Sequence, residues 1–125
     1  MGQDVISAME KKVSLSLLLA FYGDMLTENQ REMARLHWEE DLSLSEIAQQ
    51  FSVSRQSVHD TVNRTERQLE GLEEKLGLFH RHRQVESGLQ DALLSLAQVQ
   101  ATEETQRHLQ AARGRIAALL DQEEE

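Results

Sequence analysis

Cysteine and proline are both absent from this sequence of 125 residues, and aromatic residues make up only 4% of it. Because no cysteine is present, disulfides and thiolate metal ligands are excluded, and the composition fits a reducing environment. Because no proline is present, no residue in the chain forces a helix to break. The sequence therefore predicts an all-α protein whose core consists mostly of Leu, Val, Ile and Ala.

Long hydrophobic runs are absent as well. The longest continuous apolar run covers residues 17–22, whereas a membrane-spanning helix needs roughly 20 apolar residues. A secretory signal would need a longer apolar stretch followed by a small-residue cleavage site. We therefore expect neither a membrane span nor a secretory signal, and we expect a cytoplasmic protein.

Positive charge is scarce, and the net charge of the chain is −9. Residues 27–77 alone carry six basic and eleven acidic side chains, hence a net charge of −5. Proteins that bind nucleic acid without sequence preference neutralise phosphates with basic side chains. The charge therefore disfavours strong non-specific binding to duplex DNA.

Residues 42–62 have the spacing of a helix-turn-helix motif. We predict that Ser45 caps the first helix, because its side-chain oxygen can accept a hydrogen bond from an otherwise unpaired backbone N–H. Ile47, Ala48 and Phe51 then lie on one face of that helix. The small Ala48 allows the two helices of the motif to cross closely.

The second helix of the motif is predicted to follow a turn over residues 52–54, with Ser54 as its cap and Val53 filling the corner of the turn. It runs from Arg55 to about Leu76, where Gly77 is placed to end it. Its apolar residues alternate between spacings of four and three, which is typical of a heptad-like seam that needs a partner. The partner can be the N-terminal helix, the C-terminal helices or a second copy of the chain. The seam consists of Val58, Val62, Thr65, Leu69, Leu72, Leu76 and Phe79.

The N-terminal part is predicted to contain a disordered extension over residues 1–8 and two helices. The first helix, over residues 12–25, has so broad an apolar face that we expect burial on more than one side, against the motif, a second subunit or both. A homodimer is therefore possible. Thr27 and Gln30 form a capping box that begins the second helix, which has Trp38 in the core. The apolar spacing of the first helix is set by Val13, Leu17, Phe21 and Met25, and its face is widened by Leu15, Leu18, Leu19 and Tyr22.

The C-terminal part is predicted to form a helical hairpin over residues 81–122, which follows a helix-turn-helix domain over residues 9–80. The basic segment HRHR at residues 80–83 marks the junction between them. Its two histidines point to different faces of a helix and make a poor metal site. An acidic tail over residues 123–125 ends the sequence.

Motifs that carry enzyme chemistry are missing. The sequence has no Gly-rich phosphate loop, no paired-histidine zinc motif and no nucleophile elbow. We therefore expect no catalytic residues, no metal ligands, no cofactor and no small-molecule substrate.

The outward face of the second motif helix is the candidate binding surface, because a helix-turn-helix presents the start of that helix to its ligand. Arg and Gln side chains can hydrogen-bond to base edges, and further arginines can reach phosphates. Asp60 lies in the middle of this face and disfavours indiscriminate DNA binding. The candidate contact residues are Arg55, Gln56, His59, Asn63, Arg64 and Arg67.

The stretch LTENQREMARLHWEEDLSLSEIAQQFSVSRQSVHDTVNRTERQLEGLEEKL resembles region four of bacterial sigma factors. With LLLAFYGDMLTENQ before it and NRTERQLEGLEEKLGLF at its end, the layout of about residues 12–80 is more similar to the YlxM family, small bacterial helix-turn-helix proteins associated with the signal recognition particle. The resemblance implies a regulatory or accessory role in co-translational targeting. The partners that it implies are the RNA of the particle, its protein GTPase and the receptor.

The sequence departs from the usual motif at Ser52, where glycine often adopts the left-handed turn conformation. If the turn is unchanged, a non-glycine residue there costs on the order of 1 kcal/mol.

Two functions remain open at the level of the sequence. The first is an adaptor or regulator that binds the RNA or protein of the signal recognition particle. The second is a DNA-binding transcription regulator of the sigma-region-four type. A net charge of −5 over the motif region favours the first, or a module that binds only protein.

Overall fold

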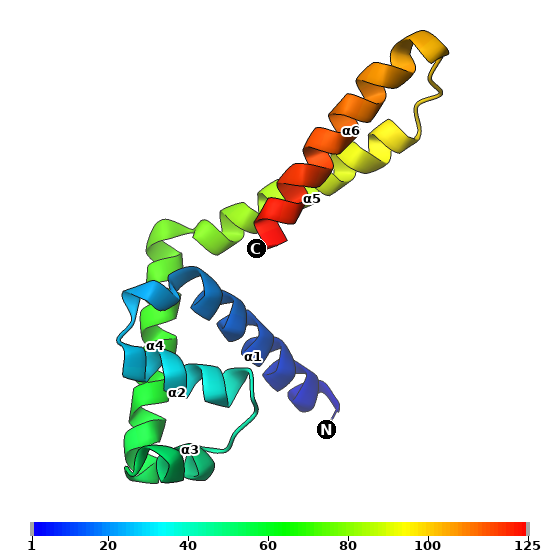
Figure 1. Cartoon of the computed structure of the whole chain (residues 1–125). Coiled ribbons are helices and arrows are strands. Elements are labelled where there is room, and N and C mark those ends of the chain that lie inside the picture. Colours follow the sequence, from blue (N-terminus) through cyan, green and yellow to red (C-terminus); the bar gives the residue numbers. More distant parts are fainter. Residues whose placement is uncertain (1, 125) are drawn as a thin grey trace. The chain divides into compact units, whose positions relative to one another are not determined.

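The computed structural model describes the backbone of residues 2–124 and the side chains of residues 9–122. All regular structure in this part of the chain is helical (Figure 1), which confirms the predicted all-α fold. The chain divides into two compact units, Met1–Phe79 and His80–Glu125, and each is described by itself. No helix in the described part is long and apolar enough to cross a membrane.

Helix α1 spans Gly2–Tyr22 and is followed by a short 3-10 helix, η1, at Gly23–Met25. The sequence predicted a disordered extension over residues 1–8 and a helix only from residue 12. The structure instead gives helical backbone from Gly2 onward, because no proline interrupts this stretch. Met1 and the side chains of residues 1–8 lie outside the described residues.

The residues of α1 that pack on the core are not the residues whose spacing predicted the helix. Val13 and Leu17, which set the predicted spacing, have side chains that are 59% and 42% exposed. On the same side of the helix, Phe21 packs edge-on against Phe79, with ring centroids 5.7 Å apart. The covered face consists of Leu15, Leu18, Leu19 and Tyr22.

Helices α2, Glu28–Trp38, and α3, Leu44–Phe51, each begin with a capping box. The Gln30 backbone N–H donates to Thr27 Oγ1, as predicted. In α3 the cap is Ser43, and the predicted cap at Ser45 is wrong. Ser43 is favoured because Glu46 stands three residues later. The Glu46 backbone N–H donates to Ser43 Oγ, and the Ser43 backbone N–H donates to Glu46 Oε1, which completes the box.

The turn between α3 and α4 keeps the left-handed geometry that the family motif implies. Ser52 has φ 55° and ψ 45°, so it adopts the conformation that glycine tolerates best. The Val53 backbone N–H donates to the Ala48 carbonyl at 3.0 Å, which closes the turn. The Val53 side chain is 40% exposed, so it does not fill the corner as predicted.

Helix α4, Arg55–Leu76, is the longest element of the helix-turn-helix and has the predicted bounds. The Ser57 backbone N–H donates to Ser54 Oγ at its start, and Gly77 adopts the left-handed conformation at its end, both as predicted. Helices α1, α2 and α3 all pack against α4 (Figure 1). The predicted seam is therefore filled largely within one chain. Its buried members are Val58, Val62, Thr65 and Leu69.

A partly buried polar junction joins α1 to the end of α4 and the start of α5, Leu78–Ala97. The Tyr22 hydroxyl, on a side chain that is 1% exposed, donates to Glu73 Oε1 at 2.7 Å. The Leu78 backbone N–H donates to Tyr22 Oη at 3.1 Å, and the Phe79 backbone N–H donates to Glu73 Oε1 at 3.1 Å. Burial, reinforced by the hydrogen bond to Glu73, raises the pKa of Tyr22, so the hydroxyl remains a donor.

The second unit contains most of α5 and all of α6, Glu103–Glu124. Residues 80–83, predicted as a junction, lie inside α5, because this segment contains no helix breaker. The Arg113 guanidinium of α6 donates to the Leu96 carbonyl of α5 at 2.8 Å. The side chains of the predicted acidic tail, residues 123–125, lie outside the described residues. The half-buried apolar residues of the two helices are Leu89, Leu93, Leu96, Leu109, Ala112, Ile116 and Leu120.

Replacing Tyr22 with phenylalanine tests the polar junction. Tyr22→Phe removes the hydrogen bond to Glu73 and leaves the Leu78 N–H without its acceptor. We expect the free energy of unfolding to fall by about 1–3 kcal/mol, the cost of unpaired buried polar groups. Urea denaturation checks this value, and an unchanged midpoint would show that the junction does not stabilise the fold.

Replacing Ser52 with glycine tests the strain in the turn. Glycine relieves the left-handed strain but makes the unfolded chain more flexible, so we expect Ser52→Gly to stabilise the protein by a few tenths of a kcal/mol and at most about 1 kcal/mol. Ser52→Ala is the matched control, because it removes the hydroxyl but keeps the Cβ. Equal stabilisation by both substitutions, measured by thermal unfolding, would contradict the strain argument.

Candidate nucleic-acid interface

The six candidate contact residues all lie on α4, away from the face that packs on the core. Arg55, Gln56, Arg64 and Arg67 are exposed, and His59 and Asn63 are half-buried. The buried residues of α4 recur at spacings of four and three, so the remaining positions form one continuous outward face. The structure therefore brings the predicted set together on one helix.

The polar residues of this face are linked along the helix. Gln56 Nε2 donates to Asp60 Oδ1 at 2.9 Å, and Asn63 Nδ2 lies 3.2 Å from His59 Nε2. Both contacts join residues one helical turn apart, so they hold the side chains against the helix surface. Asp60 thus sits among the candidate residues with its carboxylate already engaged by Gln56.

The three arginines of this face differ from the basic residues of α1 and α2. Arg55, Arg64 and Arg67 form no ion pair with any described residue. The basic residues of α1 and α2, by contrast, are paired with carboxylates. Lys11 contacts Glu66 at 2.7 Å, Lys12 contacts Asp41 at 3.2 Å, and Arg31 contacts Asp24 at 2.9 Å.

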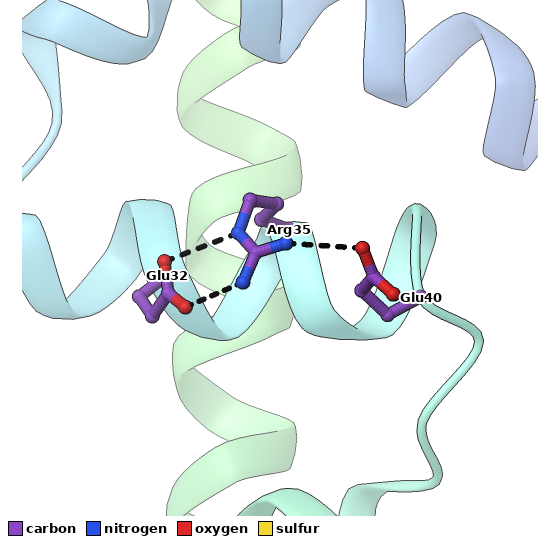
Figure 2. Close-up of polar contacts among 3 residues, drawn as sticks. All are labelled: Glu32, Arg35 and Glu40. Carbon is purple, nitrogen blue, oxygen red and sulfur yellow. Dashed lines mark hydrogen bonds and ion pairs between the residues drawn. The ribbon is translucent and has the colours of Figure 1, made fainter.

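Figure 2 shows the fourth pairing, in which Arg35 of α2 is held between two carboxylates. Its guanidinium forms a two-pronged contact with Glu32, at 2.7 Å and 3.2 Å, and a third contact with Glu40 at 3.2 Å. The hydrogen bonds from Arg35 lower the pKa of Glu32 below its usual 4.5. A lowered pKa means that the contribution of this pair to stability is present above pH 4.5 and is lost as the pH falls through the lowered pKa.

Because the basic side chains of α1 and α2 are paired with carboxylates, the unpaired basic side chains of the first unit lie on α4. A paired arginine must give up its carboxylate before it contacts a phosphate, whereas an unpaired one exchanges only water. The exposed amide of Gln56 and the imidazole of His59 can reach base edges from the first turns of the helix. The face can therefore combine a few phosphate contacts with polar contacts to bases.

Acidic residues flank this face on α4. Glu66 and Glu70 line a shallow hollow together with Asn63 and Arg67. Glu66 lies three residues after Asn63 and Glu70 three residues after Arg67, so each is a neighbour on the helix surface. Their carboxylates limit how closely a long run of phosphates can follow the helix.

Comparisons with known proteins agree with this architecture. Residues 9–110 match the model of the UPF0122 family, whose description reads "Putative helix-turn-helix protein, YlxM / p13 like". The chain is similar to a UPF0122 protein of Desulforamulus reducens, with 36% identity over 94% of this chain and 99% of that protein. It is also similar to one of Geobacillus kaustophilus, with 45% identity over 66% of this chain and 78% of that protein.

The family match covers the helix-turn-helix, all of α5 and the start of α6, so it extends beyond the stretch that the sequence motifs alone had identified. The resemblance to YlxM proteins is confirmed by the model match and by the relatives. The chain belongs to the UPF0122 family of YlxM-like helix-turn-helix proteins.

Proposed function

We propose that this protein is a non-enzymatic accessory factor of the bacterial signal recognition particle, and that it binds the RNA of the particle in the cytoplasm through the outward face of α4. The observation that carries the proposal is the contrast between Arg55, Arg64 and Arg67, which have no ion pair among the described residues, and the paired basic residues of α1 and α2. The link to the particle comes from the similarity to the YlxM family.

Structured RNA fits this surface better than long duplex DNA. Among the described residues of α4, the outward cations are three unpaired arginines and Lys75 in the last turn, beside the half-buried His59. Asp60, Glu66 and Glu70 lie among them. Non-specific duplex binding requires many phosphate contacts along an extended basic surface. A folded RNA offers unpaired bases and closely spaced phosphates, which a small mixed surface can recognise.

Sequence-specific DNA binding is the alternative function. One feature supports it, namely the position of α4 in the helix-turn-helix motif. Helix α4 begins at the turn of a helix-turn-helix, with Gln56 and His59 in the position from which such helices reach the major groove. In that case α4 would contact base pairs, and the protein would act as a transcription regulator of the sigma-region-four type.

Binding measurements with single arginine substitutions test the proposal. We expect Arg55→Ala and Arg64→Ala each to weaken binding to particle RNA on the order of tenfold, because each removes one phosphate or base contact. The slope of log affinity against log salt concentration should fall by about one for each lost phosphate contact. Fluorescence anisotropy at two or more salt concentrations measures both effects.

Arg31→Ala is the matched control, because it removes the same charge from α2, where Arg31 is paired with Asp24. We expect this variant to bind RNA as the unaltered protein does. Equal losses in all three variants would indicate a general charge effect and contradict a site on α4. Tight, strongly salt-dependent binding to duplex DNA that Arg55→Ala and Arg64→Ala abolish would establish the alternative, and a stable complex with the particle's GTPase without RNA would make the protein an adaptor.

A further inference from the structure

A single residue interrupts the helix between α4 and α5. Helix α4 ends at Leu76 and α5 begins at Leu78, so that only Gly77 is non-helical. Its φ of 62° lies in the left-handed region, which takes the chain out of the α4 helix. Residues 73–80 contain no proline and no β-branched residue, so apart from this glycine the local sequence favours a helix that runs on.

The apolar spacing of α4 also continues past this break. Leu72 and Leu76 are followed at the next step of three by Phe79, which lies beyond Gly77. In an unbroken helix these side chains would lie on one face with Leu69. The pattern of residues is therefore that of a single helix, and the break must come from contacts with another part of the chain.

Hydrogen bonds to side chains hold the chain after the break. The Gly77 N–H still donates to the Glu73 carbonyl at 2.8 Å, which is the ordinary helical bond. The Leu78 N–H donates instead to Tyr22 Oη, and the Phe79 N–H donates to Glu73 Oε1, both at 3.1 Å. The first N–H groups of α5 are thus capped by two side chains from outside α5, because Gly77 has no side chain that could cap them.

An unbroken helix would satisfy the same N–H groups without these side chains. The Leu78 N–H would donate to the Glu74 carbonyl, and the Phe79 N–H would donate to the Lys75 carbonyl. Two hydrogen bonds would replace two, so the number of backbone hydrogen bonds does not decide between the broken and the unbroken form. Contacts that only the broken form makes must decide it.

Those contacts come from the last turn of α1. The Phe21 ring packs edge-on against the Phe79 ring, with centroids 5.7 Å apart and an interplanar angle of 69°. Tyr22, whose side chain is 1% exposed, anchors the same turn in the core and accepts the Leu78 N–H. Each of the two residues that follow Gly77 is therefore held by one aromatic residue of α1.

We propose that the last turn of α1 acts as a latch: while Phe21 and Tyr22 are docked, the helix breaks at Gly77, and when they are released, α4 continues through Gly77 into α5 as one helix. The way in which the chain leaves α4 then depends on whether α1 is docked. All residues of the latch belong to the first unit. They lie at the end of α4 that is away from the turn of the motif, and the latch does not depend on the proposed RNA binding.

Nuclear magnetic resonance of the full chain tests the latch in a double variant, Tyr22→Phe with Gly77→Ala. Tyr22→Phe removes the hydroxyl that accepts the Leu78 N–H. Gly77→Ala acts through the backbone, because no atom beyond the chain neighbours of Gly77 lies within 4 Å of the position that its Cβ would take. Alanine disfavours the left-handed form and favours the helix, so this change alone should shift the ratio of unbroken to broken helix on the order of 50-fold.

The two forms differ in the nuclear Overhauser effects between α-protons and the amide protons three residues later. We expect the unaltered protein to lack these effects across the break, and the double variant to show them from Lys75 to Leu78 and from Leu76 to Phe79. The α-carbon chemical shifts of Leu76 and Leu78 should move to helical values in the double variant, and part of the way in Gly77→Ala.

Gly71→Ala is the matched control, because Gly71 lies inside α4 and the position of its Cβ is equally open. It raises the helix preference of α4 without changing the break, so we expect the broken form to remain. A double variant that still lacks the two effects across Gly77 would overturn the proposal, and so would their appearance in Gly71→Ala. If the double variant does not fold, Gly77→Ala decides alone, and unchanged α-carbon shifts at Leu76 and Leu78 would then overturn the proposal.

Discussion

Packing along one face of α4 determines which surfaces of the first unit are buried and which remain exposed to solvent. Val58, Val62 and Leu69 are inaccessible or nearly so, and the buried Thr65 satisfies its hydroxyl by donating to the Thr61 carbonyl at 2.8 Å. Because α1, α2 and α3 all cover this face, the opposite face of α4 is the one that remains in water. The position of the candidate binding residues is thus a direct consequence of where the core lies.

Features decided by local chemistry could be predicted from the sequence. The bounds of α4, its cap at Ser54 and its end at Gly77 follow from short-range hydrogen bonding and backbone preference, and all three were predicted correctly. The cap of α3 was misplaced because Ser43 and Ser45 are both competent caps. Only the hydrogen bond that the Ser43 backbone N–H donates to the Glu46 side chain distinguishes them, and this requires the correct register.

Features decided by contacts between distant segments could not be predicted. Periodicity shows that α1 is apolar on two sides, but the side that meets the core depends on the helices packed against it. The pairing of Lys11 with Glu66 and of Lys12 with Asp41 likewise joins residues far apart in the chain. For this reason the net charge of −5 over residues 27–77 does not reveal that the arginines of α4 are unpaired. The structure is needed to distinguish them from the ion-paired basic residues of α1 and α2.

The position of Trp38 determines how the two units can be observed. It is the only tryptophan in the chain, it is 6% exposed in the core of the first unit, and the second unit contains no Trp, Tyr or Phe. Its fluorescence therefore reports the melting of the first unit alone, whereas an amide signal reports both. A fluorescence transition that does not coincide with the amide transition would identify the two units as separate cooperative folding blocks, without any label or substitution.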